Sequence, residues 1–165
     1  MKNIQSIFIA SVLTVGISAM PNPRGIDVAS EATTNLTHLQ SRDQDPRGPF
    51  CDISGYRATL QSKIRDDIAK LHKLEGDCTA PAGPSGCVRV SCTNGGAVWM
   101  CNDNSSPSRA PCSLLGDYAQ AILDKCGKKV GGHKEVQGQL FDAGAGPGGS
   151  GGWGNVVVGL DSAPC

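Results

Sequence analysis

Aromatic residues, a net charge of either sign and closely spaced cysteines are all scarce in this sequence. Aromatic residues make up only 4% of the chain, which argues against a large aromatic core or an aromatic platform for sugar stacking. The 15 basic residues are balanced by 15 acidic ones, which excludes a strongly basic nucleic-acid binder and a polybasic membrane-surface protein. No two cysteines lie closer than Cys87 and Cys92, and because zinc sites favour C-x-x-C pairs, no metal is expected.

Long apolar runs are also absent, except for a short one near the first residue. Lys2 precedes an apolar run over residues 4–15, which is too short to span a bilayer and is followed by small residues. This pattern predicts a signal peptide over residues 1–19, cleaved after Ala19 or Met20, rather than a membrane anchor. We therefore expect a secreted, extracellular protein without a membrane span.

Residues 20–42 are polar, lack cysteine and show no periodic apolar face, so they cannot bury enough surface to offset their chain entropy. The segment ends in a Leu-x-x-Arg string at Arg42, which resembles the ending of pro-segments cut by kexin-type proteases in fungal secretory pathways. We predict either a pro-segment removed after Arg42 or a disordered tail. The folded unit is expected to be a single domain over residues 43–165.

Two amphipathic helices are expected in this domain. Leu60, Ile64 and Ile68 recur at helical spacing within residues 56–74. A second, shorter helix is expected over residues 113–125, just before a cysteine and a glycine suited to a helix end.

The segment between the two helices predicts a β-hairpin. Asn94 and Gly95 are a strong two-residue turn signal, because both positions tolerate positive φ. A turn there pairs Val90 with Trp99 and points both side chains toward the helices. Valine and tryptophan also favour strands on their own.

Further strands are expected over residues 134–141 and 153–160, with an extra one at Phe50 and Cys51. The element order predicts an α+β fold, with two helices packed on one face of a small antiparallel sheet. Such an α/β sandwich is similar to a split β-α-β unit, here stapled by disulfides.

All eight cysteines lie within residues 43–165, and an even number behind a signal peptide indicates four disulfides. Sequence alone cannot select a pairing, but the element order narrows the choice. One bond should close the longest loop between the ends of the domain, one should fix the second helix to the sheet, and two should close local loops. The expected pairs are Cys51–Cys165, Cys92–Cys126, Cys78–Cys87 and Cys101–Cys112.

A glycine-rich segment over residues 142–152 joins the last two strands. It matches G-x-G-x-x-G and G-x-S-x-G, but a valine strand follows instead of a helix, so neither a dinucleotide cofactor nor a hydrolase nucleophile is predicted. The segment is typical of a solvated hairpin loop, and the alternative is a contact with a target, because functional loops are often mobile. The residues singled out for that contact are Gly144, Gly146, Gly149 and Trp153.

His133, Glu135 and Arg89 raise one catalytic alternative. A small secreted ribonuclease needs a histidine, a carboxylate and an arginine on one sheet face, to move protons and bind phosphate. No spacing forces these three residues together, so no catalytic residue, no cofactor and no enzyme activity is predicted.

Asn104 begins an Asn-x-Ser sequon. The sequon lies in a loop rich in serine, proline and asparagine between two cysteines, where an acceptor should be accessible. We therefore predict a glycoprotein.

Several features together resemble the fungal small secreted cysteine-rich effectors, in particular the killer-toxin-like group. These features are the signal peptide, the Leu-x-x-Arg ending, the string CVRVSCTNGGAVWMCND, a helix ending at Cys126, and a last strand before Cys165. The resemblance covers residues 86–165 and concerns element order more than residue identity, so no functional residue is carried over.

The resemblance implies a non-enzymatic effector or toxin that binds a target of another cell, in host virulence or avirulence or in antifungal killing. We expect a monomer whose partner is a protein or surface component of a host or competitor. The two should meet outside cells, which in a plant host means the apoplast. No nucleic-acid partner is expected. The alternative is a small secreted ribonuclease-like hydrolase.

Overall fold

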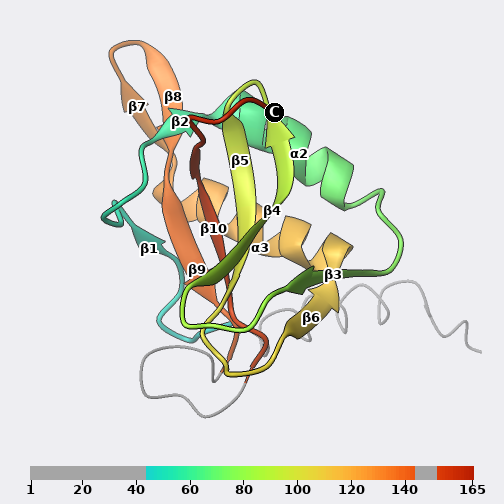
Figure 1. Cartoon of the computed structure of the whole chain (residues 1–165). Coiled ribbons are helices and arrows are strands. Elements are labelled where there is room, and N and C mark those ends of the chain that lie inside the picture. Colours follow the sequence, from blue (N-terminus) through green and yellow to red (C-terminus); the bar gives the residue numbers. More distant parts are fainter. Residues whose placement is uncertain (1–43, 144–151) are drawn as a thin grey trace, which may run out of the picture.

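The computed structural model describes residues 44–143 and 152–165 (Figure 1). The predicted processing sites at Ala19 and Arg42, and the predicted contact residues Gly144, Gly146 and Gly149, lie outside the described residues. The described elements, in chain order, are β1 (Phe50–Cys51), β2 (Thr59–Leu60), α2 (Gln61–Leu71), β3 (Asp77–Ala80), β4 (Gly86–Thr93), β5 (Gly96–Asn102), β6 (Ser108–Pro111), α3 (Cys112–Cys126), β7 (Lys128–Val130), β8 (His133–Val136), β9 (Gly138–Phe141) and β10 (Asn155–Leu160).

Five strands form the main sheet, in the order β1-β9-β10-β5-β4, and all neighbouring strands are antiparallel. The central strand β10 carries three consecutive valines, which favour extended backbone and suit a strand that is buried on both faces. Val156 and Val158 belong to the core on the helix side, whereas Val157 is buried on the opposite face. The predicted strand at Phe50 and Cys51 is confirmed as the edge strand β1.

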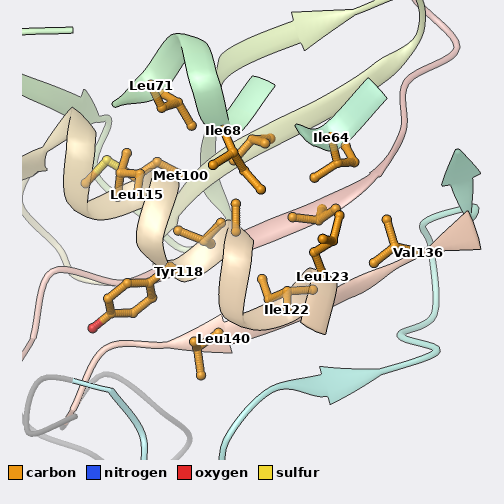
Figure 2. Packing of buried hydrophobic residues seen from close by; sticks show 14 of the residues in the cluster. Ile64, Ile68, Leu71, Met100, Leu115, Tyr118, Ile122, Leu123, Val136 and Leu140 are labelled. Carbon is orange, nitrogen blue, oxygen red and sulfur yellow. The ribbon is translucent and has the colours of Figure 1, made fainter. Parts of the chain in front are cut away.

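The two helices cover one face of the main sheet (Figure 1). α2 contacts β4 and β5, and α3 contacts β9 and β10. Figure 2 shows the core between these layers, to which α2 contributes Ile64 and Leu71, α3 contributes Leu115 and Ile122, and β5 contributes Met100. All five side chains are fully buried.

α2 begins at Gln61, later than the predicted start at residue 56. The residues before Gln61 make tertiary contacts instead of a helical turn. Thr59 pairs with β8, and the Tyr56 ring packs on Trp99 with a centroid distance of 5.3 Å. The predicted second helix is confirmed as α3, which is one residue longer than predicted at each end.

The predicted hairpin turn is confirmed, with φ values of 49° at Asn94 and 83° at Gly95. The register is as expected next to the turn, but a β-bulge after Arg89 shifts it by one residue. Trp99 therefore pairs with Arg89 and not with Val90. The predicted orientation of Trp99 is wrong, because its neighbours on β5 now occupy the helix side and Trp99 points away from the helices.

The α+β class is confirmed in its coarse form, with two helices, antiparallel sheets and four disulfides in the described part of the chain. The strand content is larger than expected, since two small sheets, β2-β8-β7 and β3-β6, accompany the main one. The strand predicted over residues 134–141 is split at Gln137 between two sheets. The buried Gln137 amide holds this crossing by donating hydrogen bonds to the carbonyl oxygens of Ile53 and Tyr56, the latter at 3.1 Å.

Every cysteine forms a disulfide, but none of the four predicted pairings forms. The predicted bonds Cys51–Cys165, Cys78–Cys87, Cys92–Cys126 and Cys101–Cys112 are wrong. The observed bonds are Cys51–Cys126, Cys78–Cys112, Cys87–Cys101 and Cys92–Cys165.

The bulge in β4 explains the first of these differences. It places Cys87 directly opposite Cys101, with their Cα atoms 4.0 Å apart, so these two cysteines pair across the hairpin. Cys112 then pairs with Cys78, because β3 lies beside β6 and α3 starts where β6 ends.

The paths of the chain ends explain the other two bonds. Past β10, the Asp161 N–H donates to the Gly95 carbonyl oxygen at 2.7 Å, which brings Cys165 to the end of β4 and to Cys92. The C-terminal end of α3 lies beside β1, where Cys51 pairs with the last residue of the helix.

Candidate functional site

The β7–β8 hairpin extends beyond the helices at one end of the molecule (Figure 1). Its turn is formed by Gly131 and Gly132, with φ values of 54° and 88°. Positive φ at both central positions is the geometry of the tightest hairpin turns, and glycine adopts it without strain. The turn thus fixes the register of the two short strands.

This register places Lys129 directly opposite Lys134. Lys134 shares a face of β8 with Val136, whose side chain is fully buried in the core. Both lysines therefore point toward the side of the hairpin on which the helices lie. Like charges directly opposite each other destabilise a strand pair, so the fold carries a cost at this position.

A groove lies between this hairpin and the two helices, and we call it the basic groove. It consists of two adjoining hollows that share Gln61, Arg65 and Lys134. The larger hollow, of about 540 Å³, extends to His133, and the smaller one, of about 280 Å³, extends to Lys129.

Gln61 joins α2 to the hairpin at the base of the basic groove. Its Nε2 donates to the Glu135 carbonyl oxygen at 3.3 Å, and the residue is buried. The adjacent Gly127 leaves space for this amide, because a Cβ at that position would overlap the Gln61 side chain. Arg65 lies four residues after Gln61 on α2, so its side chain faces the same groove.

The positive charge of the basic groove is only partly balanced. Lys128 forms an ion pair with Asp52 at 2.6 Å. Within the described residues, Arg65, Lys129 and Lys134 form no ion pair and are exposed. Three cations, from α2, β7 and β8, therefore converge on one groove with no carboxylate partner among the described residues.

One carboxylate lines the smaller hollow. It belongs to Asp124, which accepts a hydrogen bond from Gln120 Nε2 on the same helix at 2.7 Å. Its single charge leaves the groove with a positive excess. At the tip of the hairpin, Val130 is 44% exposed and adds an apolar contact beside the lysines.

This arrangement is suited to an acidic ligand. A guanidinium group presents paired donors that match a carboxylate, phosphate or sulfate, and ammonium groups add unoriented charge around it. Because the two hollows adjoin, the groove fits a ligand with more than one acidic group.

The predicted contact residue Trp153 is half-buried and packs against the core. Its ring lies on Tyr118, with a centroid distance of 5.1 Å, and its backbone N–H donates to the Asp142 carboxylate at 3.1 Å. The indole N–H is buried and has no hydrogen-bond partner among the described residues. A role for Trp153 in target contact stays a prediction.

The predicted glycosylation site is exposed. Asn104 lies in the loop between β5 and β6, and its Nδ2 donates to the Gly152 carbonyl oxygen at 3.1 Å. Glycosylation of Asn104 stays a prediction.

The three residues of the ribonuclease alternative lie in different sheets. His133 and Glu135 are on β8 of the three-stranded sheet, whereas Arg89 is on β4, an edge strand of the main sheet. The Arg89 guanidinium is paired with Asp161 at 2.7 Å. Hydrogen bonds from the Ala163 N–H and from Arg89 lower the pKa of Asp161, which keeps this pair charged.

The basic groove was not predicted from the sequence, although part of its signal was present. A Gly-Gly pair flanked by short strand-forming runs indicates a hairpin, and Lys129 and Lys134 are placed symmetrically around Gly131 and Gly132. Arg65 could not be found in this way, because it comes from a helix far away in the sequence. Because the basic and acidic residues of the whole sequence are equal in number, the composition does not indicate this local excess of positive charge.

No protein-family model matches this chain, and no curated protein or solved structure matches it either. The resemblance to fungal effectors therefore stays a prediction. Across residues 44–143 and 152–165, no group of three or more histidine, cysteine or acidic side chains is arranged to hold a metal ion. No helix in the same ranges is long and apolar enough to cross a bilayer.

Proposed function

We propose that this protein is a secreted, disulfide-stapled effector or toxin that acts by binding an acidic component of another cell, with the basic groove as its docking surface. The observation that carries the proposal is the convergence of Lys129, Lys134 and Arg65 without an ion-pair partner. The pair of opposed lysines lowers the stability of the fold. An acidic ligand that neutralises the two lysines explains why the pair is kept.

The disulfides support an extracellular site of action. Four bonds that engage all eight cysteines are typical of small domains that fold and work in oxidising compartments. Two of them tie β1 and β3 to α3, and the other two tie β4 to β5 and to the C-terminal residue, which favours a rigid framework that binds without reshaping. The same proposal includes four expectations from the sequence. The protein is of fungal origin, is a monomer, carries a glycan at Asn104 and is related to split β-α-β folds.

Nucleic acid is a less suitable ligand for the basic groove than an acidic glycan or lipid headgroup. Proteins that bind single strands combine positive charge with aromatic side chains on which the bases stack. Among the described residues, the groove is lined by charged, polar, aliphatic and glycine residues and by His133, with no phenylalanine, tyrosine or tryptophan.

Binding of the labelled mature protein to intact plant and fungal cells tests the proposal. The variant Lys129→Glu/Lys134→Glu reverses the groove charge, and Lys73→Glu/Arg109→Glu makes the same change in net charge at two exposed positions on other elements. We expect wild type and the control to bind with an affinity that falls as salt increases, and the groove variant to bind about tenfold more weakly or worse. Equal binding by the groove variant, or equal loss in both variants, would refute the docking surface.

The same preparations separate binding from catalysis. Infiltration into plant tissue should produce a response with wild type and the control but not with the groove variant. A ribonuclease assay on the same samples covers the alternative: RNA cleavage that is lost in His133→Ala, with the fold retained, would overturn a mechanism of binding alone.

A further inference from the structure

The low aromatic content argued against a platform for sugar stacking, but the face of the main sheet opposite the helices concentrates the few aromatic side chains of this protein. The sequence holds two tryptophans, two tyrosines and three phenylalanines, and four of these seven lie on this face. Phe50 packs edge-on against Phe141 with a centroid distance of 6.0 Å, and Tyr56 packs in the same way on Trp99 at 5.3 Å.

The strand register determines which residues share this outer face. One row runs across four strands through Cys87, Cys101, Asn155 and Phe141. The next row runs through Arg89, Trp99, Val157, Gln139 and Phe50. Because successive residues alternate between faces, both rows point away from the helices.

A hollow of about 190 Å³ opens on this face between the two aromatic pairs. Tyr56 and Phe141 form its walls, while Val157 and the Cys87–Cys101 disulfide contribute its apolar base. The polar residues among the described lining are Ser85, Asp103, Gln139 and Asn155.

Asn155 is a largely buried polar residue in the lining of this hollow, and its hydrogen-bonding capacity is only partly used. It lies on the central strand and is only 5% exposed, yet its amide makes one long hydrogen bond among the described residues, from Nδ2 to Gln139 Oε1 at 3.4 Å. An amide offers two donors and an acceptor, and buried polar groups are normally satisfied. The free capacity of Asn155 and Gln139 therefore faces the hollow.

The charges around the hollow favour an uncharged ligand. None of the described residues that line it is a lysine, arginine or histidine, and the nearby Arg89 is already paired with Asp161 at 2.7 Å. Asp103 is the one carboxylate in the lining, and it accepts a hydrogen bond from the Ser85 N–H at 2.9 Å. An anion would meet no compensating charge here, whereas hydroxyl groups could donate to Asp103 and exchange hydrogen bonds with the amides.

We infer that this hollow binds one ring of a neutral saccharide, with an apolar ring face against Tyr56 or Phe141 and hydroxyl groups bonded to Asn155, Gln139 and Asp103. A sugar ring combines an apolar C–H face with a rim of hydroxyls, which matches aromatic walls beside amide and carboxylate groups. This site is separate from the basic groove and does not depend on the proposed function.

Titration with neutral oligosaccharides followed by NMR tests the inference. Cellohexaose, laminarihexaose and chitohexaose are the probes, at up to about 10 mM, since a single ring gives at best weak affinity. At least one probe should shift the side-chain amide signals of Asn155 and Gln139 and the indole signal of Trp99 in a saturable manner. No saturable shift of these signals with any of the three would overturn the site.

Two variants and a matched control complete the test. Gln139→Ala and Tyr56→Leu change half-buried side chains at the rim and should weaken binding about tenfold. Gln120→Ala removes a comparable amide from α3 and should leave affinity unchanged. Melting temperature and circular dichroism confirm the fold of each variant, and a folded Gln139→Ala and a folded Tyr56→Leu that both bind like wild type would refute the assignment. Lys129→Glu/Lys134→Glu should bind the saccharide normally, which distinguishes failure of this site from failure of the basic groove.

Discussion

The observed disulfides predict that Cys51–Cys126 stabilises the fold more than Cys87–Cys101. The perturbation is a pair of double variants, Cys51→Ala/Cys126→Ala and Cys87→Ala/Cys101→Ala. The two pairs are well matched, because each joins one buried cysteine (Cys126 or Cys101) to one exposed cysteine (Cys51 or Cys87). The difference between the variants therefore depends mainly on the length of chain that each bond closes.

The magnitude follows from the sequence separations of 75 and 14 residues. In the chain-entropy model, a bond that closes a loop of the first size stabilises by about 4.5 kcal/mol and one of the second size by about 3 kcal/mol. Removing the longer link should therefore cost about 1.5 kcal/mol more, which corresponds to about 6 °C in melting temperature for a domain of this size.

Thermal melts and urea unfolding of the two variants measure this difference. Non-reducing peptide mapping first verifies that the three remaining bonds are intact in each variant. If Cys87→Ala/Cys101→Ala proved as unstable as its counterpart, or more so, loop length would not determine the contribution of these bonds. Peptide mapping of the wild type that found Cys51–Cys165 would contradict the observed connectivity itself.

Three further predictions concern single residues. Lys129→Glu replaces the like-charged pair with Lys134 by an opposite pair, so melts at low salt should show a gain of about 0.2–1 kcal/mol that fades at high salt. Asp67 is fully buried, and desolvation raises its pKa above the unfolded value of 3.8, so its contribution to stability is complete below that value and is lost as the pH rises through the folded pKa. Asp67→Asn should therefore gain stability relative to wild type between about pH 3 and pH 7, which urea unfolding at each pH measures. Gly138→Ala places a Cβ 2.8 Å from the Phe50 carbonyl oxygen and should cost about 1–3 kcal/mol in the same assay.

Local signals in the sequence were sufficient for several elements. The apolar spacing of Ile64 and Ile68 located α2, and the turn preference of Asn94-Gly95 located the β4–β5 hairpin. These features depend on residues within a few positions of one another, where helix and turn preferences act directly. The even cysteine count likewise indicated four disulfides, since that inference needs no geometry.

The start of α2 and the division of residues 134–141 depended on distant partners. Thr59 belongs to β2 because it pairs with β8. Gln137 donates hydrogen bonds to carbonyl oxygens of a segment far away in the sequence. Local preference cannot represent such contacts, because tertiary pairing overrides it.

The sequence by itself determined the mixed fold class, the two helices, the main hairpin and the presence of a disulfide framework. Tertiary structure alone decided which cysteines meet, because a one-residue bulge in β4 placed Cys87 opposite Cys101. It also decided that Trp99 lies on the outer face, because its neighbours Val98 and Met100 on β5 pack in the core. It also brought Arg65 to Lys129 and Lys134, and collected four scattered aromatic side chains on one sheet face. The physical reason is the same in each case: both candidate sites are assembled from residues distant in the sequence, and a one-residue change of strand register reverses the face that every later side chain occupies.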